Sequence, residues 1–389
     1  FYKRIINEKN LDKQLVNLFV NLCSSMQTIM ENEATDSGSI RDILTCCEVV
    51  LDFCWQRINT GFWKNVSIDI RYIFGYTSLV KCICLVVLNE DLLTVLKTCD
   101  VGLLMSPPFM NNILAKIASI VHTFKIQKQP VTSCRFNLEP IYKETNTKRE
   151  INRVKFIDII EFEEKYFLPQ IPVIIEGAID FWPAVDKNST TKWNLEYILN
   201  TAAYRTVPVE IGSKYTDENW SQKLMTIQEF VNNYIFNKID VAYIAQHELF
   251  NQIEELSKDF SVPDYCCLSR SQDTCEVSIN AWFGPAGTVS PLHFDPNDNL
   301  LTQVFGSKYI RLYSSDSPTE MIYAHQTPLL HNTSQVDVEK PDLEKFPLFS
   351  KLEYLECILK EGEILFIPPK FWHFVKSLSP SFSISFWWK

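Results

Sequence analysis

The first third of the chain carries apolar residues at the spacing of amphipathic helices. Apolar side chains recur every three or four residues in stretches that begin at Leu11, Ile43 and Ile113. This spacing places them on one face of a helix. Glycine and proline are scarce before Ser106-Pro107-Pro108, which is typical of a loop between helices. We predict an all-α domain over residues 1–127, with about five to seven helices whose apolar stripes form its core.

A polar stretch separates this region from a second pattern. Residues 128–152 are rich in charge and contain two prolines, as a linker or wrapping arm would. From Val173 to Trp388, short runs rich in β-branched and aromatic residues alternate with turn residues. Many short strands at this spacing predict a jelly-roll barrel over residues 153–389, with helices outside it. The expected fold class is therefore α+β.

Composition and charge narrow the possible functions. The 389 residues are 46% hydrophobic and 22% charged, which suits a folded protein, and the length favours two domains. A net charge of −10 argues against direct nucleic-acid binding and suits a partner with basic side chains. The longest uncharged apolar run, Cys82–Leu88, is too short to cross a membrane, so we expect an intracellular protein.

Twelve cysteines raise the question of disulfides or structural zinc. Cys46-Cys47 and Cys266-Cys267 are vicinal, and Cys82-x-Cys84 lacks the second pair that a tetrahedral zinc site needs. We therefore expect most cysteines to be buried free thiols that pack as small apolar residues.

Two motifs far apart in the chain carry the candidate metal chemistry. His293 and Asp295 stand two residues apart in a predicted strand, so their side chains point to the same face. The run Gly362–His373 predicts a second strand, with His373 just past its end. Two imidazoles and one carboxylate leave one side of an octahedral metal open, as in non-haem Fe(II) oxygenases. We interpret the three as catalytic metal ligands; the alternative for each histidine is a hydrogen-bonded residue at a strand end.

Lys308 lies on the apolar face of a predicted strand. It shares strand parity with Ile310 and Leu312, so its ammonium would face the interior, where a charge requires an anion. The 5-carboxylate of 2-oxoglutarate would be such an anion. The alternative is an edge-strand lysine that prevents aggregation.

In their order, these motifs resemble the JmjC family of Fe(II)/2-oxoglutarate oxygenases. The segments that carry the likeness are Asn280–Gly284, Ser290–Asp295, Lys308–Tyr309, Gly362–Glu363 and Trp372–His373. The resemblance implies a double-stranded β-helix of the cupin-like type that holds Fe(II) and uses 2-oxoglutarate and O2.

The resemblance also implies individual roles. The iron ligands would be His293, Asp295 and His373, and the cosubstrate contacts would come from Tyr243, Ser290, Asn299, Lys308 and Trp387. Substrate contacts would come from Glu210, with Gln246 and Trp282 lining the same pocket. The residues themselves leave alternatives open: Tyr243 and Trp387 as core aromatics, and Glu210 as a solvated carboxylate at a strand end.

The implied activity is hydroxylation of a protein, with release of succinate and CO2. We expect arginyl C3 hydroxylation, because Glu210 and Trp282 suit a guanidinium by ion pairing and stacking. Removal of methyl groups from histone lysines by the same iron centre is the alternative. Either substrate is a protein with a basic side chain, such as a histone or another nuclear protein, which suggests the nucleus and the cytoplasm as locations. A cupin-type isomerase with Zn or Mn, or a non-catalytic binding protein, would not require Lys308.

Overall fold

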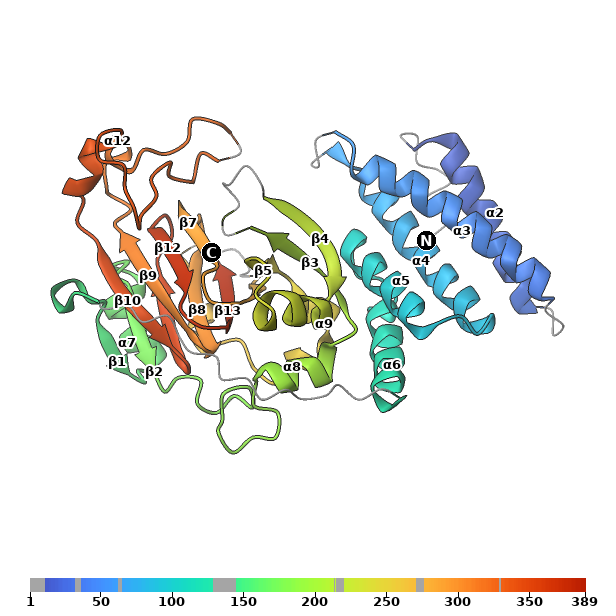
Figure 1. Ribbon diagram of the computed structural model, residues 1–389, viewed down its shortest axis with the longest axis horizontal. Helices are drawn as coiled ribbons and strands as arrows, with labels where there is room; N and C mark the ends of the chain where they lie inside the picture. The colour runs from blue at the N-terminus through green and yellow to red at the C-terminus, as the bar shows by residue number, and fades with distance from the viewer. Residues whose placement is uncertain are drawn as a thin grey trace. The chain divides into compact units, whose positions relative to one another are not determined.

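The structure, a computed structural model, describes residues 11–31, 36–61, 65–128, 145–212, 214, 220–270, 276–328 and 330–389. The chain forms two compact units (Figure 1). The first comprises Phe1–Val131 and the short segment Ala202–Thr206, and the second comprises Thr132–Thr201 and Val207–Lys389. Most of the arm predicted at 128–152 lies outside the described residues.

The first unit is helical, as predicted. Its described helices are α2 (Lys13–Glu31), α3 (Ser37–Ile58), α4 (Ile68–Val87), α5 (Leu92–Met105) and α6 (Ile113–Lys128). Each helix packs against the next one in the chain (Figure 1). The apolar stripes read from the sequence form the core, where side chains such as Leu15, Phe19 and Val50 are buried.

α4 is long and apolar enough to cross a membrane by length and composition alone. The short uncharged run Cys82–Leu88 did not predict this, because α4 also contains the charged residues Asp69, Arg71 and Lys81. Of its most apolar window, 44% is buried inside the protein, because α3 and α5 pack against it. The core helix of a water-soluble bundle passes the same test, and the burial of α4 fits that role.

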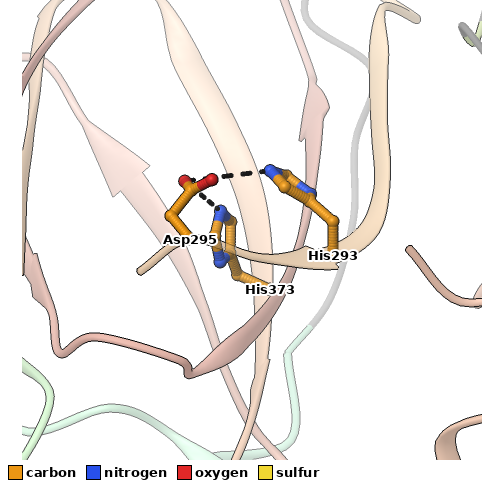
Figure 2. A group of neighbouring side chains, drawn as sticks. All are labelled: His293, Asp295 and His373. Atoms are coloured by element: carbon orange, nitrogen blue, oxygen red, sulfur yellow. Dashed lines mark ion pairs between the residues drawn. The ribbon is translucent and has the colours of Figure 1, made fainter. Parts of the chain in front are cut away.

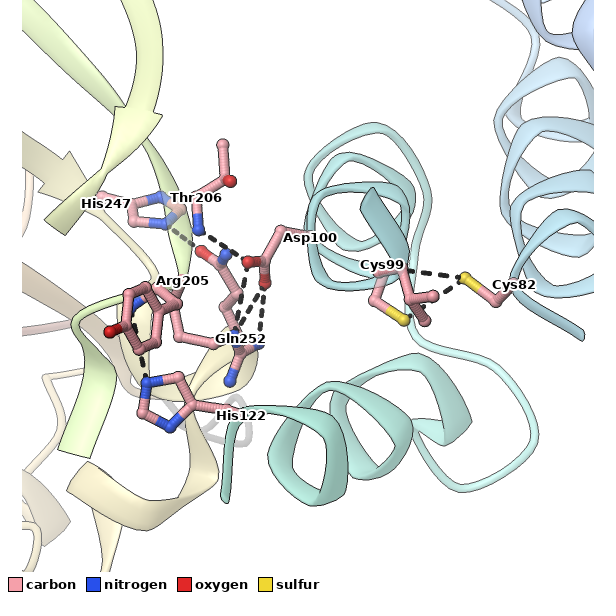
Figure 3. A network of polar contacts seen from close by, with 10 residues as sticks. Cys82, Cys99, Asp100, His122, Arg205, Thr206, His247 and Gln252 are labelled. Carbon is pink, nitrogen blue, oxygen red and sulfur yellow. Dashed lines mark hydrogen bonds and ion pairs between the residues drawn. The ribbon is translucent and has the colours of Figure 1, made fainter. Parts of the chain in front are cut away.

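A buried ion pair joins α5 to the segment Ala202–Thr206 within the helical unit (Figure 3). The Arg205 guanidinium donates to Asp100 at 3.0 Å from Nε and 2.7 Å from Nη2, and the Thr206 N–H donates to the same carboxylate at 2.6 Å. The side chains are 1% and 0% exposed. Two opposite charges thus lie in contact away from water, and the Thr206 backbone adds a further bond to the carboxylate.

The cysteines of the helical unit are mostly core residues. The ten cysteines with described positions in the chain are free thiols, and seven of them are buried. Cys82 on α4 and Cys99 on α5 lie closest, with 3.3 Å between their sulfur atoms (Figure 3). The contact with Cys99 and burial raise the pKa of Cys82, which keeps it a protonated thiol.

The second unit contains two β-sheets (Figure 1). In spatial order the larger sheet comprises β1 (Arg153–Lys155), β2 (Val173–Glu176), β11 (Glu363–Ile367), β8 (Asp298–Phe305), β13 (Ser381–Trp388), β6 (Ser278–Gly284), β5 (Ala242–His247), β3 (Thr206–Ile211) and β4 (Ser221–Thr226). The smaller sheet comprises β10 (Leu355–Lys360), β9 (Ser307–Tyr313), β12 (Trp372–Ser377) and β7 (Val289–Phe294).

Short helices complete this unit. They are η2 (Thr147–Arg149), α7 (Ile159–Phe162), η3 (Glu163–Phe167), α8 (Leu195–Ala202), α9 (Ile227–Phe230), η4 (Val231–Phe236), α10 (Leu249–Gln252), α11 (Glu254–Ser257), η5 (Asp264–Cys267), α12 (Thr319–Ile322) and η6 (Pro347–Lys351). The predicted α+β architecture, a helical region followed by a jelly-roll with flanking helices, is confirmed.

The two sheets enclose an apolar layer. Leu301 and Leu365 from the larger sheet meet Ile310 and Val375 from the smaller one. The turn between β8 and β9 depends on Gly306, whose φ is +77° and whose added Cβ would collide with the carbonyl oxygen of Pro380. Only glycine fits there, so this turn fixes the register at which β9 enters the smaller sheet.

Candidate metal centre and cosubstrate cavity

The two predicted histidine ligands face each other across neighbouring strands. β7 and β12 are antiparallel, and His293 pairs with His373 in their register. Their imidazole centroids are 4.1 Å apart, and Asp295 follows directly after β7 (Figure 2). Register and strand parity thus bring together residues that lie 80 positions apart in the chain.

The three side chains converge on one point. Asp295 Oδ2 lies 4.0 Å from His293 Nε2 and 3.6 Å from His373 Nε2 (Figure 2). One ligand atom from each residue lies within 4.8 Å of the others, and this is the one such cluster found in the described part of the chain. Two imidazole nitrogens and a carboxylate oxygen suit a divalent transition metal and leave positions free for other ligands.

Backbone hydrogen bonds set the tautomer of both imidazoles. His293 Nδ1 lies 2.7 Å from the carbonyl oxygen of Pro291, and His373 Nδ1 lies 3.0 Å from that of Phe371. A carbonyl oxygen only accepts, so each Nδ1 carries the proton and each Nε2 lone pair is free toward Asp295. Burial, with the neighbouring His293 adding to it, lowers the pKa of His373 to about 4, which keeps its ring neutral and ready to bind a cation.

The residues around Thr333 cover the open edge of β7, the strand that carries His293. β7 is the last strand of the smaller sheet, and the residues around Thr333 pair with it. The Phe294 N–H donates to the carbonyl of Asn332 at 3.0 Å, and the Ser334 N–H donates to that of Leu292 at 2.8 Å. These bonds fix both residues that flank His293.

Lys308 is buried beside the metal cluster. Its side chain is 1% exposed, and β9 lies between β10 and β12, so the edge-strand alternative is wrong. Nζ donates to the Tyr243 hydroxyl at 2.9 Å, and among the described residues no carboxylate forms an ion pair with it. Burial lowers the pKa of Lys308 to about 7. An incoming carboxylate would supply the missing counter-charge.

One cavity is lined by His293, Asp295 and His373 and by all five residues predicted to contact the cosubstrate. Its lining comprises Tyr243, Trp282, Ser290, His293, Asp295, Asn299, Leu301, Lys308, Ile367, His373, Val375, Ser385 and Trp387. Among the described residues, the buried atoms Asn299 Oδ1 and Trp387 Nε1 have no hydrogen-bond partner there. The Trp387 indole N–H, the Lys308 ammonium and the Tyr243 hydroxyl are donors, so they fit a small dicarboxylate that accepts hydrogen bonds, whereas Asn299 could donate to it only from its side-chain amide nitrogen. The sequence did not predict the apolar lining residues Leu301, Ile367 and Val375, because a strand pattern does not show which buried residues border a cavity.

Of the residues predicted to contact the substrate, Trp282 lines the cavity and Glu210 does not. Trp282 lines the cavity, and its indole N–H donates to Ser385 at 2.9 Å. Glu210 is half-buried outside the lining, opposite Tyr243 in the β3–β5 register. Its carboxylate accepts a hydrogen bond from the Trp220 indole at 3.2 Å, a contact the sequence did not suggest, and burial raises its pKa. It is therefore not the fully solvated carboxylate of the alternative reading.

Gln246 differs from the expectation that it lines the same pocket. It is exposed, has a φ of +46°, and is absent from the cavity lining. The register between β5 and β6 shifts between Ile244 and His247, so strand alternation breaks at this residue. A resemblance transfers residue types, but this bulge decides where the side chain points.

Comparison with known proteins fits this geometry. The family model of the cupin-like domain matches residues 160–389, the region that holds the metal cluster and the cavity. "Lysine-specific demethylase 8" of Danio rerio is 43% identical over 88% of this chain and 86% of its own length. The chain belongs to the cupin-like JmjC family.

Other JmjC relatives extend the likeness. "Jumonji C domain-containing protein 5" of Drosophila melanogaster is 36% identical over 87% of this chain and 85% of its own length. "Lysine-specific demethylase JMJ30" of Arabidopsis thaliana is 45% identical over 62% of this chain and 55% of its own. This JmjC protein is a 2-oxoglutarate-dependent oxygenase, so the isomerase and binding-protein readings do not hold.

The affinity for 2-oxoglutarate is expected to fall as the pH rises above about 7. In the free protein Lys308 begins to lose its proton near that pH, whereas a bound carboxylate favours the ammonium. Binding must then take up a proton, so the Kd is flat below about pH 7 and rises by up to about tenfold per pH unit above it. Titration calorimetry of Mn(II)-loaded protein from about pH 6 to about pH 9 measures this. A Lys308→Arg variant, charged throughout, is the control, and a wild-type Kd that follows that of the variant contradicts the prediction.

Proposed function

We propose that the chain holds Fe(II) through His293, Asp295 and His373 and binds 2-oxoglutarate in the adjoining cavity. The observation that carries this proposal is the convergence of two imidazoles and one carboxylate beside a buried Lys308 side chain that has no carboxylate partner among the described residues. When bound, the iron and its cosubstrate would supply the oxidising chemistry, with O2 consumed and succinate and CO2 released.

The chain's own residues would bind, orient and exclude water. Lys308 and Tyr243 would bind the far carboxylate of 2-oxoglutarate by charge-assisted hydrogen bonds. The indole N–H of Trp387 and the side-chain amide nitrogen of Asn299 would complete that shell as donors. The apolar side chains of Leu301, Ile367 and Val375 would keep water from the reacting centre.

For the substrate we favour a cationic protein side chain, and arginyl C3 hydroxylation in particular. Burial and, as a smaller cause, the nearby Glu210 carboxylate raise the pKa of the Tyr243 phenol, so Glu210 acts on a residue that lines the cavity. A half-buried carboxylate with indoles of Trp220 and Trp282 in the same region suits a planar guanidinium, which ion-pairs and stacks at once. A basic nuclear protein such as a histone would present this group.

Removal of methyl groups from lysine is the second candidate, and the comparisons favour it over arginyl hydroxylation. The relatives in Danio rerio, Xenopus tropicalis and Arabidopsis thaliana carry the name of lysine-specific demethylases. The same iron centre would oxidise an N-methyl group. A methylated ammonium, however, donates few hydrogen bonds, so it would make less use of the Glu210 carboxylate.

Mass spectrometry separates the two candidates. The protein is incubated with Fe(II), 2-oxoglutarate and two peptides that differ only in a central arginine or methylated lysine. A gain of one oxygen on the arginine peptide supports hydroxylation, and stepwise loss of methyl groups from the other supports demethylation. If neither peptide changes and no succinate forms, the proposed function is wrong.

The Glu210→Gln variant tests the arginine assignment directly. Loss of the charge should lower kcat/KM for the arginine peptide by about 10- to 100-fold, since one partner of a partly buried ion pair is removed. Glu176→Gln is the matched control, because Glu176 ends β2 and does not line the cavity. An arginine peptide turned over equally well by both variants would contradict the assigned role of Glu210.

A further inference from the structure

Two of the cavity's polar side chains are neighbours on paired strands. Asn299 on β8 and Trp387 on β13 face each other in the antiparallel register, and both line the cavity. Each has a buried polar atom that finds no partner among the residues the structure describes, Oδ1 of Asn299 and Nε1 of Trp387. Their positions are therefore set by the backbones of β8 and β13 and not by contacts of their own polar atoms.

The adjacent register pair points to the opposite face of the sheet. Asp298 pairs with Trp388, and the two side chains are 3% and 1% exposed. Both are bound by one short segment, Leu268–Arg270, which follows η5. The Trp388 indole N–H donates to the carbonyl of Leu268 at 2.8 Å, and the Arg270 guanidinium forms a very short ion pair with Asp298.

Arg270 is itself held by Phe167, the last residue of η3. Its guanidinium carbon lies 3.9 Å from the centroid of the Phe167 ring, and Nη2 donates to the Phe167 carbonyl at 2.5 Å. The same ring stacks on Trp388, with 6.3 Å between centroids and 9° between planes. The planar Arg270 guanidinium, with its several N–H donors, can stack on the Phe167 ring and bond to both Asp298 and the Phe167 carbonyl. A lysine ammonium could not make all three contacts.

We propose that Arg270 is a positioning residue for 2-oxoglutarate, acting through Asp298 and Trp388 to place Asn299 and Trp387 against the cosubstrate. Successive strand residues point to opposite faces, so a backbone shift at Asp298 moves Asn299 with it. Without Arg270, the nearly inaccessible Asp298 carboxylate would lose the one ion pair that it forms within the described part of the chain, and we expect the start of β8 to move toward water. This inference rests on the proposed binding of 2-oxoglutarate.

The test measures cosubstrate affinity apart from catalysis. Full-length wild type and Arg270→Ala are loaded with Mn(II), and the Kd for 2-oxoglutarate and for Mn(II) is obtained by titration calorimetry. We expect Arg270→Ala to raise the Kd for 2-oxoglutarate by about tenfold or more, as loss of an outer partner does at other sites, and to leave the Kd for Mn(II) within about twofold. Arg270→Lys should not restore the affinity, because the planar contacts with Phe167 are lost.

Arg153→Ala is the matched control for a purely structural role. Arg153 pairs with Glu363 at similar burial, with side chains 22% and 9% exposed against 26% and 3% for Arg270 and Asp298. It lies on β1, at the edge of the same sheet, and does not line the cavity. Both variants should lower the thermal midpoint, but only Arg270→Ala should weaken 2-oxoglutarate binding.

The possible failures are distinguishable. An Arg270→Ala protein that is folded and binds 2-oxoglutarate like wild type overturns the positioning role. Wild type that does not bind 2-oxoglutarate overturns the proposed function, and with it this inference. If Arg270→Ala does not fold, Trp388→Phe keeps an aromatic ring against Phe167 and removes the bond to Leu268 together with part of the ring volume. Its Kd for 2-oxoglutarate should rise by about two- to fivefold, and no rise would overturn the proposal.

Discussion

Replacing His293 by alanine is expected to abolish 2-oxoglutarate turnover. The variant keeps one imidazole and one carboxylate at the cluster, and two protein ligands hold a divalent ion far more weakly than three. Succinate release should fall by more than about 100-fold, since loss of an outer partner alone costs about 10- to 100-fold. Metal content after dialysis, measured by atomic emission, should fall in parallel with succinate release.

His331→Ala is the control for this experiment. The imidazole of His331 also has its Nδ1 close to a backbone carbonyl, that of Pro328 at 3.0 Å, but the residue is exposed and lies outside the cavity. Its replacement should leave both metal content and succinate release unchanged. Wild-type succinate release from His293→Ala would remove the metal assignment altogether.

The largest loss of stability is expected from Asp100→Ala. The change removes the carboxylate that pairs with the buried Arg205 guanidinium and accepts a hydrogen bond from the Thr206 N–H. Breaking a buried pair on one side costs about 3–5 kcal/mol, against a total stability of about 5–15 kcal/mol for a typical domain. Urea unfolding followed by far-ultraviolet circular dichroism, which reports the helices, should show the shift.

Two variants make this prediction specific. Arg57→Ala breaks an ion pair of the same helical unit whose side chains are 57% and 33% exposed, and it should cost less than about 1 kcal/mol. The double variant Asp100→Leu with Arg205→Met removes both charges and should recover much of the lost stability, because the desolvation cost of both ions disappears. If Asp100→Ala and Arg57→Ala unfold at the same urea concentration, the buried pair does not stabilise the unit as described.

The metal cluster could be predicted from the sequence because strand geometry is regular. A spacing of two between His293 and Asp295 fixes a common face, and the apolar pattern predicted the strand β11 before His373; His373 itself lies in the next strand, β12, which the sequence did not separate from β11. Lys308 could be predicted for the same reason, since one polar residue among apolar residues of equal parity must point inward. Short-range periodicity was enough to predict which way these side chains point. That His293 and His373 lie side by side follows from the register of β7 with β12.

Contacts between distant segments could not be predicted in this way. Asp100 is the one acidic residue of helix α5. No pattern in the sequence around it predicts that its partner is Arg205, 105 residues later. The bond from Trp220 to Glu210 and the ion pair from Arg270 to Asp298 are also tertiary. Such partners follow from packing of loops, which carry no periodic pattern.

The backbone bonds to His293 and His373 bear on which ion the protein takes up. Because carbonyls already fix both rings, nickel or cobalt would meet the same three donors in the same arrangement as iron. Affinity of such nitrogen and oxygen donors rises from iron through cobalt to nickel. Under the proposed metal assignment, the arrangement of the three donors would not select iron over these competitors, so the metals available around the protein would decide which ion occupies the site.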